Sequence, residues 1–142
     1  MNNRMKIEFP AKSENERLAR SVCAAFVLEL DPTVVEISEL KTAVSEAVTN
    51  SIIHGYSDEN GMIEIEAELC GNTAKFILRD FGCGIDDIKL AMQPLYSGSG
   101  DKERSGMGFS IMEAFMDKLE VESGPSEGTT ITMTKRFSVN EQ

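Results

Sequence analysis

The residues best suited to chemistry recur at helical spacing within one stretch, SEAVTNSIIHG (45–55). Glu46, Asn50 and His54 lie four residues apart, so a helix carries them as a single polar stripe. They supply a carboxylate, an amide oxygen and the only histidine of the chain. This set suits proton transfer, Mg²⁺ coordination and phosphate binding. A solvated helix face gives the same pattern, so the stripe alone does not distinguish a site from a surface.

A second candidate is RDFGCGI (79–85), which contains the letters DFG. In eukaryotic-type protein kinases this motif carries an aspartate that binds Mg²⁺, together with a strand lysine, an HRD-type loop and an APE-type motif. The sequence has none of those three companions, so the kinase interpretation of DFG fails. Two interpretations remain. The stretch is an ordinary glycine turn, or Asp80 accepts from an exocyclic amine while Gly82 and Gly84 make room for a planar base.

A third candidate is Ser105-Gly106-Met107-Gly108-Phe109, where two glycines come just before an expected helix. Unpaired N–H groups and the positive end of a helix dipole favour anions at such a place. A plain loop with a helix cap is the alternative. The GxxxxGK[ST] pattern of a P-loop is absent, and the stretch does not follow a strand directly as a Rossmann fingerprint does.

Two helices are expected in the first half of the chain. A strand over Met5–Phe9 ends at Pro10, and a capping-box pattern at 13–16 predicts a helix from there toward Asp31-Pro32. A second helix runs from Pro32 to Gly55 and carries the polar stripe beside an apolar arc. The apolar positions expected on the first helix are Leu18, Val22, Phe26 and Leu28, and those on the second are Leu40, Val44, Ala47, Val48, Ser51 and Ile52.

The remaining elements are mainly strands. Apolar residues alternate with Glu64, Glu66 and Glu68, which predicts a strand with one acidic, solvated face. A tight turn at Gly71-Asn72 connects this strand to an antiparallel partner that ends at RDFGCGI. We expect a short helix near 86–92, a helix over 109–116, and strands at 119–123 and 129–135 around a Gly124-Pro125 turn. The predicted class is α+β, a two-layer α/β sandwich with helices on one face of a mixed, mainly antiparallel sheet.

Composition limits the class of protein. The 142 residues suffice for one domain. A formal net charge of −10 argues against direct nucleic-acid binding, which depends on Lys and Arg. Three cysteines without metal-ligand spacing suit reduced thiols in cytosol. No stretch is apolar enough for a signal peptide or membrane span. We expect a single-domain, soluble, cytoplasmic protein over 1–142, with no direct contact to nucleic acid or membrane.

Four motifs in order carry a family resemblance: Glu46-x-x-x-Asn50, Asp80-x-Gly82-x-Gly84-Ile85, Gly106-x-Gly108 and Gly128-Thr129-Thr130. Together they resemble the Bergerat ATP-binding fold shared by gyrase, heat-shock chaperone ATPases, histidine kinases and mismatch-repair ATPases. The resemblance covers almost the whole chain. It implies that the cofactors are ATP and Mg²⁺.

The resemblance also implies a role for each matching residue. Glu46 is the general base, Asn50 the Mg²⁺ ligand, and Asp80 the acceptor of the adenine amino group. Gly106 and Gly108 let backbone amides hold phosphate, with an ATP lid over about 97–108. Thr129 or Thr130 touches adenine, and Thr130 is favoured. His54 is a suggested phosphate contact. The remaining nucleotide-binding residues that the resemblance implies are Gly82, Gly84, Ile85, Ser105, Met107 and Phe109.

Within that superfamily the chain resembles the anti-sigma factors that are serine protein kinases, of the sigma F type in spore-forming bacteria. SEAVTNSIIHGY, RDFGCGI, QPLY, ERSGMGFSIMEAFMD and the terminal GTT carry this likeness. It implies a homodimer that inhibits an RNA polymerase sigma factor of the sporulation sigma F type and phosphorylates a serine of an anti-anti-sigma protein.

The chain departs from the family at 97–100, where SGSG stands in place of a frequent Thr-Thr-Lys-Pro stretch. No lysine matches there, although Lys102 or Arg104 could substitute for it. The alternative function is a nucleotide-gated, sigma-binding module with negligible kinase activity. Retention of Glu46 favours the enzyme, because a binding module needs Asn50 and Asp80 but no base.

Overall fold

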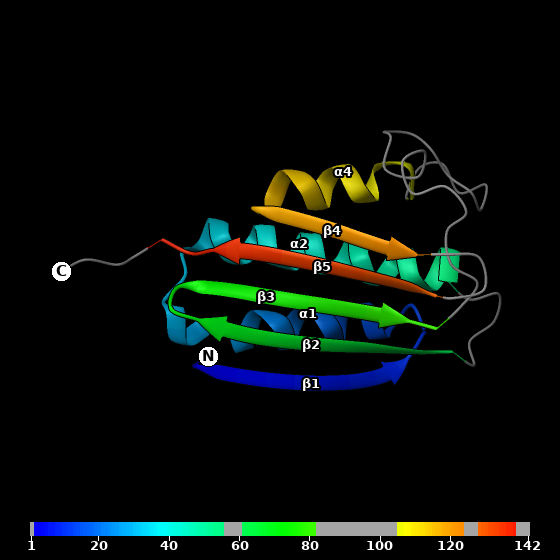
Figure 1. Ribbon diagram of the computed structural model, residues 1–142, viewed down its shortest axis with the longest axis horizontal. Helices are drawn as coiled ribbons and strands as arrows, with labels where there is room; N and C mark the ends of the chain where they lie inside the picture. Colours follow the sequence, from blue (N-terminus) through cyan, green and yellow to red (C-terminus); the bar gives the residue numbers. More distant parts are fainter. Residues whose placement is uncertain (1, 56–60, 82–104, 124–127, 139–142) are drawn as a thin grey trace.

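The computed structural model describes residues 2–55, 61–81, 105–123 and 128–138. Helices cover one face of a five-stranded sheet (Figure 1). The strands follow the order β1-β2-β3-β5-β4, and all four described pairings are antiparallel. The α+β sandwich predicted from the sequence is thereby confirmed. The strands are β1 (Asn3–Pro10), β2 (Met62–Cys70), β3 (Thr73–Asp80), β4 (Lys118–Ser123) and β5 (Thr129–Arg136).

The helical layer contains α1 (Asn15–Phe26), α2 (Val34–Asn50) and α4 (Ser105–Phe115). A 3₁₀ turn, η1 (Leu28–Leu30), follows α1, and a π-helical turn, η2 (Ser51–Gly55), continues α2 to the predicted end at Gly55. The apolar arc predicted for α2 faces the core, with Ile52 only partly buried. No helix in the described ranges is long and apolar enough to cross a bilayer.

Alternation along the strands builds the core. The fully buried inward side chains of β2, β3 and β5 pack beneath α1 and α2; they are Ile63, Ile65, Ala67, Leu69, Ala74, Phe76, Leu78, Ile131 and Met133. The β2–β3 hairpin closes through Gly71-Asn72 as predicted. Gly71 has φ +60°, which suits the first position of a two-residue hairpin turn.

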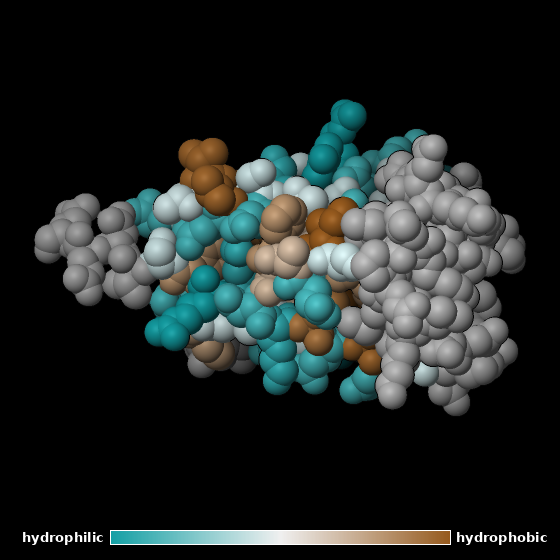
Figure 2. Space-filling model, turned by 90° about the horizontal axis from the view of Figure 1, so that it is seen from above, coloured by the Kyte–Doolittle hydropathy of each residue, from teal (hydrophilic) through white to brown (hydrophobic). Residues whose placement is uncertain are grey.

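The outward face of β2 is less solvated than its glutamates suggest. Arg79 Nη1 lies 3.0 Å from Glu64 Oε1 and 3.3 Å from Glu66 Oε1, and Lys6 Nζ lies 3.6 Å from Glu64 Oε2. These cross-strand ion pairs explain why a row of glutamates is tolerated on one face. Figure 2, which views the molecule from its β4–α4 edge, shows mainly hydrophilic residues with scattered hydrophobic ones on the described surface.

The capping box predicted at the start of α1 is wrong. The N-cap is Glu14, and no side chain caps the helix there. Glu16 does not return to Ser13, because its carboxylate accepts from the Ser45 hydroxyl of α2 and lies 3.7 Å from Arg20 Nε. The helix also ends earlier than expected, at Phe26. Of its predicted apolar positions, Leu18 is half exposed, and Leu28 lies beyond the helix with 62% of its surface exposed.

Instead, α1 turns small side chains and a thiol toward the core. Ala19 and Cys23 are fully buried on the inner face of the helix. Burial raises the pKa of the Cys23 thiol to about 12, so this thiol stays protonated and unreactive near neutral pH. Cys70, by contrast, is exposed at the end of β2.

The capping box occurs at α2. Thr33 Oγ1 accepts from Glu36 N at 3.1 Å, and Glu36 Oε1 accepts from Thr33 N at 2.9 Å. Glu36 also accepts from Ser138 N at 2.8 Å and from the Ser138 hydroxyl at 3.2 Å, which ties the segment after β5 to the start of α2. Burial would raise the pKa of Glu36, but these hydrogen bonds outweigh it and lower the pKa below 4.5.

This lowered pKa predicts a pH-dependent contribution to stability. The ionised carboxylate stabilises the fold above its usual pKa of 4.5, and the contribution is lost as pH falls through the lower folded value. Glu36→Gln should therefore unfold at a lower temperature than the wild type at pH 7, and its free energy of unfolding should fall by under about 1 kcal/mol, because the carboxylate is partly exposed and screened by solvent. The difference should shrink toward pH 3. Thermal unfolding across pH 3–7 measures it, and a constant difference would contradict the assignment.

The helix α4 begins at Ser105, four residues before its predicted start at 109. Gly106 and Gly108 therefore lie in its first turn. At the other end, Lys135 Nζ of β5 donates to Phe115 O at 2.8 Å and lies 3.3 Å from Glu39 Oε1 of α2. Lys135 thus anchors the C-terminus of α4 to both the sheet and α2. The predicted helix at 86–92, the turn Gly124-Pro125 and lid residues 97–104, with Lys102 and Arg104, lie outside the described residues.

Candidate active site

The elements that carry the predicted site residues meet at one end of the molecule. The end of α2, the start of α4, the end of β3 and the start of β5 all lie at the right of Figure 1. Antiparallel pairing places Asp80, the last residue of β3, directly opposite Thr129, the first residue of β5. The fold therefore gathers side chains that are up to 83 positions apart in the sequence, from Glu46 to Thr129.

Asn50 ends α2 with an unusual environment. Only 4% of its surface is exposed, and its Oδ1 is the one buried side-chain polar atom of the described residues that has no hydrogen-bond partner. Burying an acceptor without a partner lowers the stability of the fold unless a ligand, an ion or a water molecule binds to it. The π-helical turn begins at the next residue, and such turns are frequent at functional sites. A neutral amide oxygen in this position fits a hard cation such as Mg²⁺.

Glu46 lies one turn before Asn50 and faces α4. A Cβ built on Gly108 would lie 3.4 Å from Glu46 Oε2, so the carboxylate reaches the first turn of α4. The helices α2 and α4 pack side by side, and Gly108 is buried between them. The first N–H groups of α4 and the positive end of its dipole therefore lie beside the Glu46 carboxylate, one helical turn of α2 before Asn50.

Asp80 and Thr129 form the other part of the site. Both are buried, with 3% and 5% of their surface exposed. Gly128 precedes Thr129 at φ +77°, and a Cβ on it would come within 2.2 Å of Asp80 O and 2.9 Å of Phe81 Cα. Only glycine fits there, because any side chain would collide with the backbone that carries Asp80.

The structure places Thr129, and not the favoured Thr130, beside Asp80. Thr130 pairs with Arg79 and lies on the outward face of the sheet. The alternation itself contained this signal: Leu78 and Asp80 point inward on β3, as Ile131 and Met133 do on β5, so Thr129 shares their face. Sequence reasoning missed it by weighing the two threonines without the register.

The other predicted residues divide into two groups. Phe109 is 3% exposed and packs in the hydrophobic core beneath α4, where it supports the helix. The remaining predicted residues cannot be compared with the structure, because they or their side chains lie outside the described residues; they are His54, Gly82, Gly84, Ile85, Ser105 and Met107. The backbone of His54 lies in η2, and those of Ser105, Gly106 and Met107 lie in the first turn of α4.

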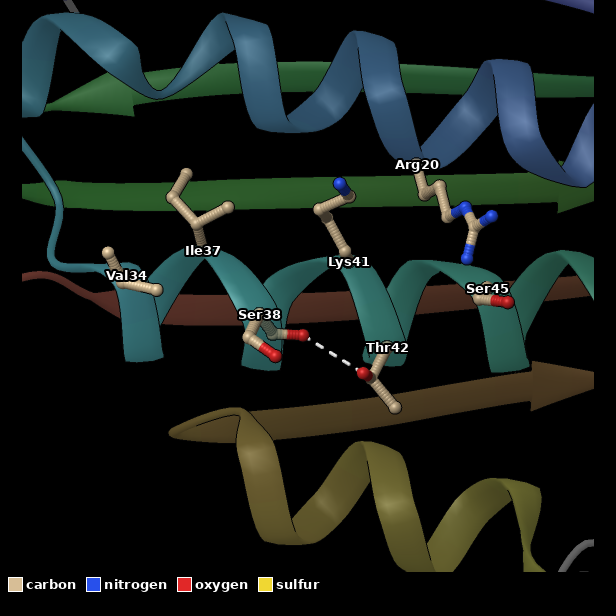
Figure 3. A pocket seen from close by; sticks show the side chains of 7 residues that line it. All are labelled: Arg20, Val34, Ile37, Ser38, Lys41, Thr42 and Ser45. Atoms are coloured by element: carbon tan, nitrogen blue, oxygen red, sulfur yellow. Dashed lines mark hydrogen bonds between the residues drawn. The ribbon is translucent and has the colours of Figure 1, made fainter.

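A separate groove runs between α1 and α2 (Figure 3). Cationic, hydroxyl and aliphatic side chains line it, and within α2 Thr42 Oγ1 donates to Ser38 O at 2.9 Å. None of the predicted site residues contributes to it. The groove offers no carboxylate for proton transfer and no amide oxygen for a cation. The residues that line it are Arg20, Val34, Ile37, Ser38, Lys41, Thr42 and Ser45.

Comparison with known proteins gives consistent matches. The model of the histidine kinase-like ATPase domain family matches residues 9–135. The anti-sigma F factor of Clostridium beijerinckii is 56% identical over 138 residues, covering 96% of each chain. That of Thermoanaerobacter sp. is 54% identical over 133 residues, covering 94% of this chain and 93% of the relative.

Solved structures share the fold at lower identity. The RsbU and RsbW domains of Rv1364c from Mycobacterium tuberculosis align with a TM-score of 0.70 and 22% identity, over 99% of this chain and 34% of that one. The catalytic domain of the histidine kinase ThkA aligns with a TM-score of 0.57 and 18% identity, over 94% and 96% of the two chains. These two likenesses concern the fold alone.

Proposed function

Because the chain belongs to the anti-sigma F factor family of histidine kinase-like ATPase domains, we propose that it inhibits a sporulation sigma factor of the F type and phosphorylates a serine of an anti-anti-sigma partner with MgATP. Anti-sigma F factors are ATP-dependent serine kinases, and the chain is an enzyme of that class. The observation that carries the mechanism is the placement of Glu46 against the first turn of α4, one helical turn from the unpaired Oδ1 of Asn50.

In this mechanism Glu46 accepts the proton of the partner's serine hydroxyl. The serine oxygen bonds to the γ-phosphorus as the bond from that phosphorus to the β–γ bridging oxygen breaks, and ADP leaves. The N–H groups at the start of α4 hold the phosphate oxygens. Asn50 would hold Mg²⁺, which neutralises the charge of the phosphates. Glu46 is close enough to α4 to face the phosphate that α4 holds.

At the strand edge, Asp80 and Thr129 bind the adenine base. Both side chains are buried and face the same side of the sheet, and Gly128 puts no side chain against the backbone that carries Asp80. A buried carboxylate that accepts a hydrogen bond from the amino group of a base discriminates strongly against bases without that group, because the carboxylate would then be buried without a donor. Gly82, Gly84 and Ile85 complete this part of the site in the proposal.

In the same proposal the chain acts in the cytoplasm as a single-domain homodimer, and residues 97–108 form the ATP lid. Its last four residues, 105–108, form the first turn of α4. The alternative function is a nucleotide-gated sigma-binding module without significant phosphoryl transfer. The position of Glu46 favours the kinase, because binding alone does not need a carboxylate at the phosphate end of the site.

The adenine assignment predicts the behaviour of Asp80→Asn. The amide can donate as well as accept, so ATP should bind about tenfold more weakly and discrimination against GTP should fall, at the scale of one hydrogen bond to a charged group. Calorimetric titration of both nucleotides measures the two effects.

The control for this variant is Asp117→Asn, which changes an exposed carboxylate outside the site. It should bind ATP like the wild type. If Asp80→Asn also binds ATP with wild-type affinity, Asp80 does not contact the base.

A further inference from the structure

Two hydrogen bonds of Ser123, the last residue of β4, lie at the edge of the proposed adenine site. Its Oγ lies 2.9 Å from Gly128 O and 2.9 Å from Thr129 Oγ1. Ser123 and Thr129 are direct cross-strand partners, and the contact is partly buried. One serine hydroxyl therefore bonds to both Gly128, which lies against the Asp80 backbone, and Thr129, which pairs with Asp80.

The protons of these groups can be assigned by counting donors. Gly128 O is a carbonyl and only accepts, so the single hydroxyl proton of Ser123 goes to it. Ser123 Oγ then accepts from Thr129, whose only hydroxyl proton is used in that bond. What Thr129 Oγ1 can still offer to the site is an acceptor lone pair. Ser123 thus fixes the direction of the Thr129 hydroxyl as well as its position.

We propose that Ser123 is a positioning residue for base selection: it holds Thr129 as an acceptor beside the acceptor Asp80. The inference rests on the proposed function, in which these two residues meet the base. Two acceptors side by side match the 6-amino group of adenine and repel the 6-carbonyl group of hypoxanthine or guanine. Without the Ser123 hydroxyl, Thr129 can rotate and donate to a 6-carbonyl group.

ATP and ITP are suitable probes, because ITP carries a carbonyl group where ATP carries the 6-amino group. In Ser123→Ala the ratio of the ITP to the ATP dissociation constant should fall about tenfold from its wild-type value, at the scale of one hydrogen bond. Ser123→Thr retains a hydroxyl and should keep the wild-type ratio. Ser123→Cys, with a weak thiol donor, should behave like Ser123→Ala and replaces it if the alanine variant unfolds.

A double-mutant cycle separates positioning from general support of the fold. In a Thr129→Ala background, Ser123→Ala should leave the ratio unchanged, because no hydroxyl remains to direct. An additional change there would overturn the inference, as would a wild-type ratio in Ser123→Ala. The wild type tests the proposed function separately: if it binds ATP and ITP equally, or binds neither, the adenine site itself is wrong.

Discussion

Glu46→Gln should reduce phosphoryl transfer to the anti-anti-sigma serine by roughly 10²–10⁴, the usual contribution of a positioned base. Glutamine keeps the size of the side chain but does not accept a proton at neutral pH. A loose transition state needs little early proton transfer, which favours the lower end of this range. Binding of MgATP should remain close to that of the wild type, because the first turn of α4 and Asn50 are unchanged. Single-turnover kinetics at saturating ATP isolates the chemical step from binding.

The matched control is Glu113→Gln, which changes an exposed carboxylate on α4. It should transfer phosphate at the wild-type rate. Should Glu46→Gln also react at that rate, Glu46 is a structural residue between α2 and α4, and the alternative of a nucleotide-gated binding module gains support.

Asn50→Ala should remove most of the Mg²⁺ dependence of nucleotide binding. The variant lacks the buried Oδ1 that has no protein partner, so the metal loses an oxygen ligand. We expect MgATP to bind about 10–100-fold more weakly, while ATP in the presence of a chelator binds about as before. Titrations with and without Mg²⁺ give the two affinities.

Asn50→Asp is the companion variant, because a carboxylate oxygen at the same place can still bind the metal. It should recover at least part of the Mg²⁺ dependence. The apo form of Asn50→Ala should remain folded, since Oδ1 makes no hydrogen bond within the described protein that the substitution would break. An Asn50→Ala protein with wild-type Mg²⁺ dependence would show that the metal binds elsewhere.

Local pattern predicted the sheet well, because alternation and turn chemistry act over a few residues. The inward residues of β2 and β3 and the turn at Gly71 follow directly from their sequence. The buried arc of α2 is likewise encoded at 100° per residue, and it places Glu46 and Asn50 on the border of the core. These features required no knowledge of distant contacts.

Errors arose where a tertiary contact outweighed the local pattern. Glu16 binds Ser45 and Arg20 instead of completing a capping box. Ser45 is far from Glu16 in the sequence, so the local pattern around α1 could not predict this contact. The early start of α4 is similar. Glycines disfavour helix, yet Gly108 lies inside α4, where the helix packs against α2 and the Glu46 carboxylate lies close to its Cα.

Predicting the arrangement of the site from the sequence requires the register of the paired strands as well as the local pattern. Thr129 is identified beside Asp80 once β3 and β5 are paired, and the period of two would have selected it over Thr130. The Ser123 bridge depends in addition on the pairing of β4 with β5 and on two 2.9 Å distances. Neither the alternation of β4 nor its composition distinguishes Ser123 from an ordinary strand end.

In the proposed function this site transfers the γ-phosphoryl group of ATP to a protein serine. The most direct test mixes the wild-type protein, preloaded with γ-labelled ATP and Mg²⁺, with an excess of an anti-anti-sigma partner in a single turnover. We predict that label appears on one serine of the partner, in an amount equal to the bound ATP, and that a chelator of Mg²⁺ prevents the transfer. Tight binding of ATP and of the sigma factor without any labelled serine would contradict this account.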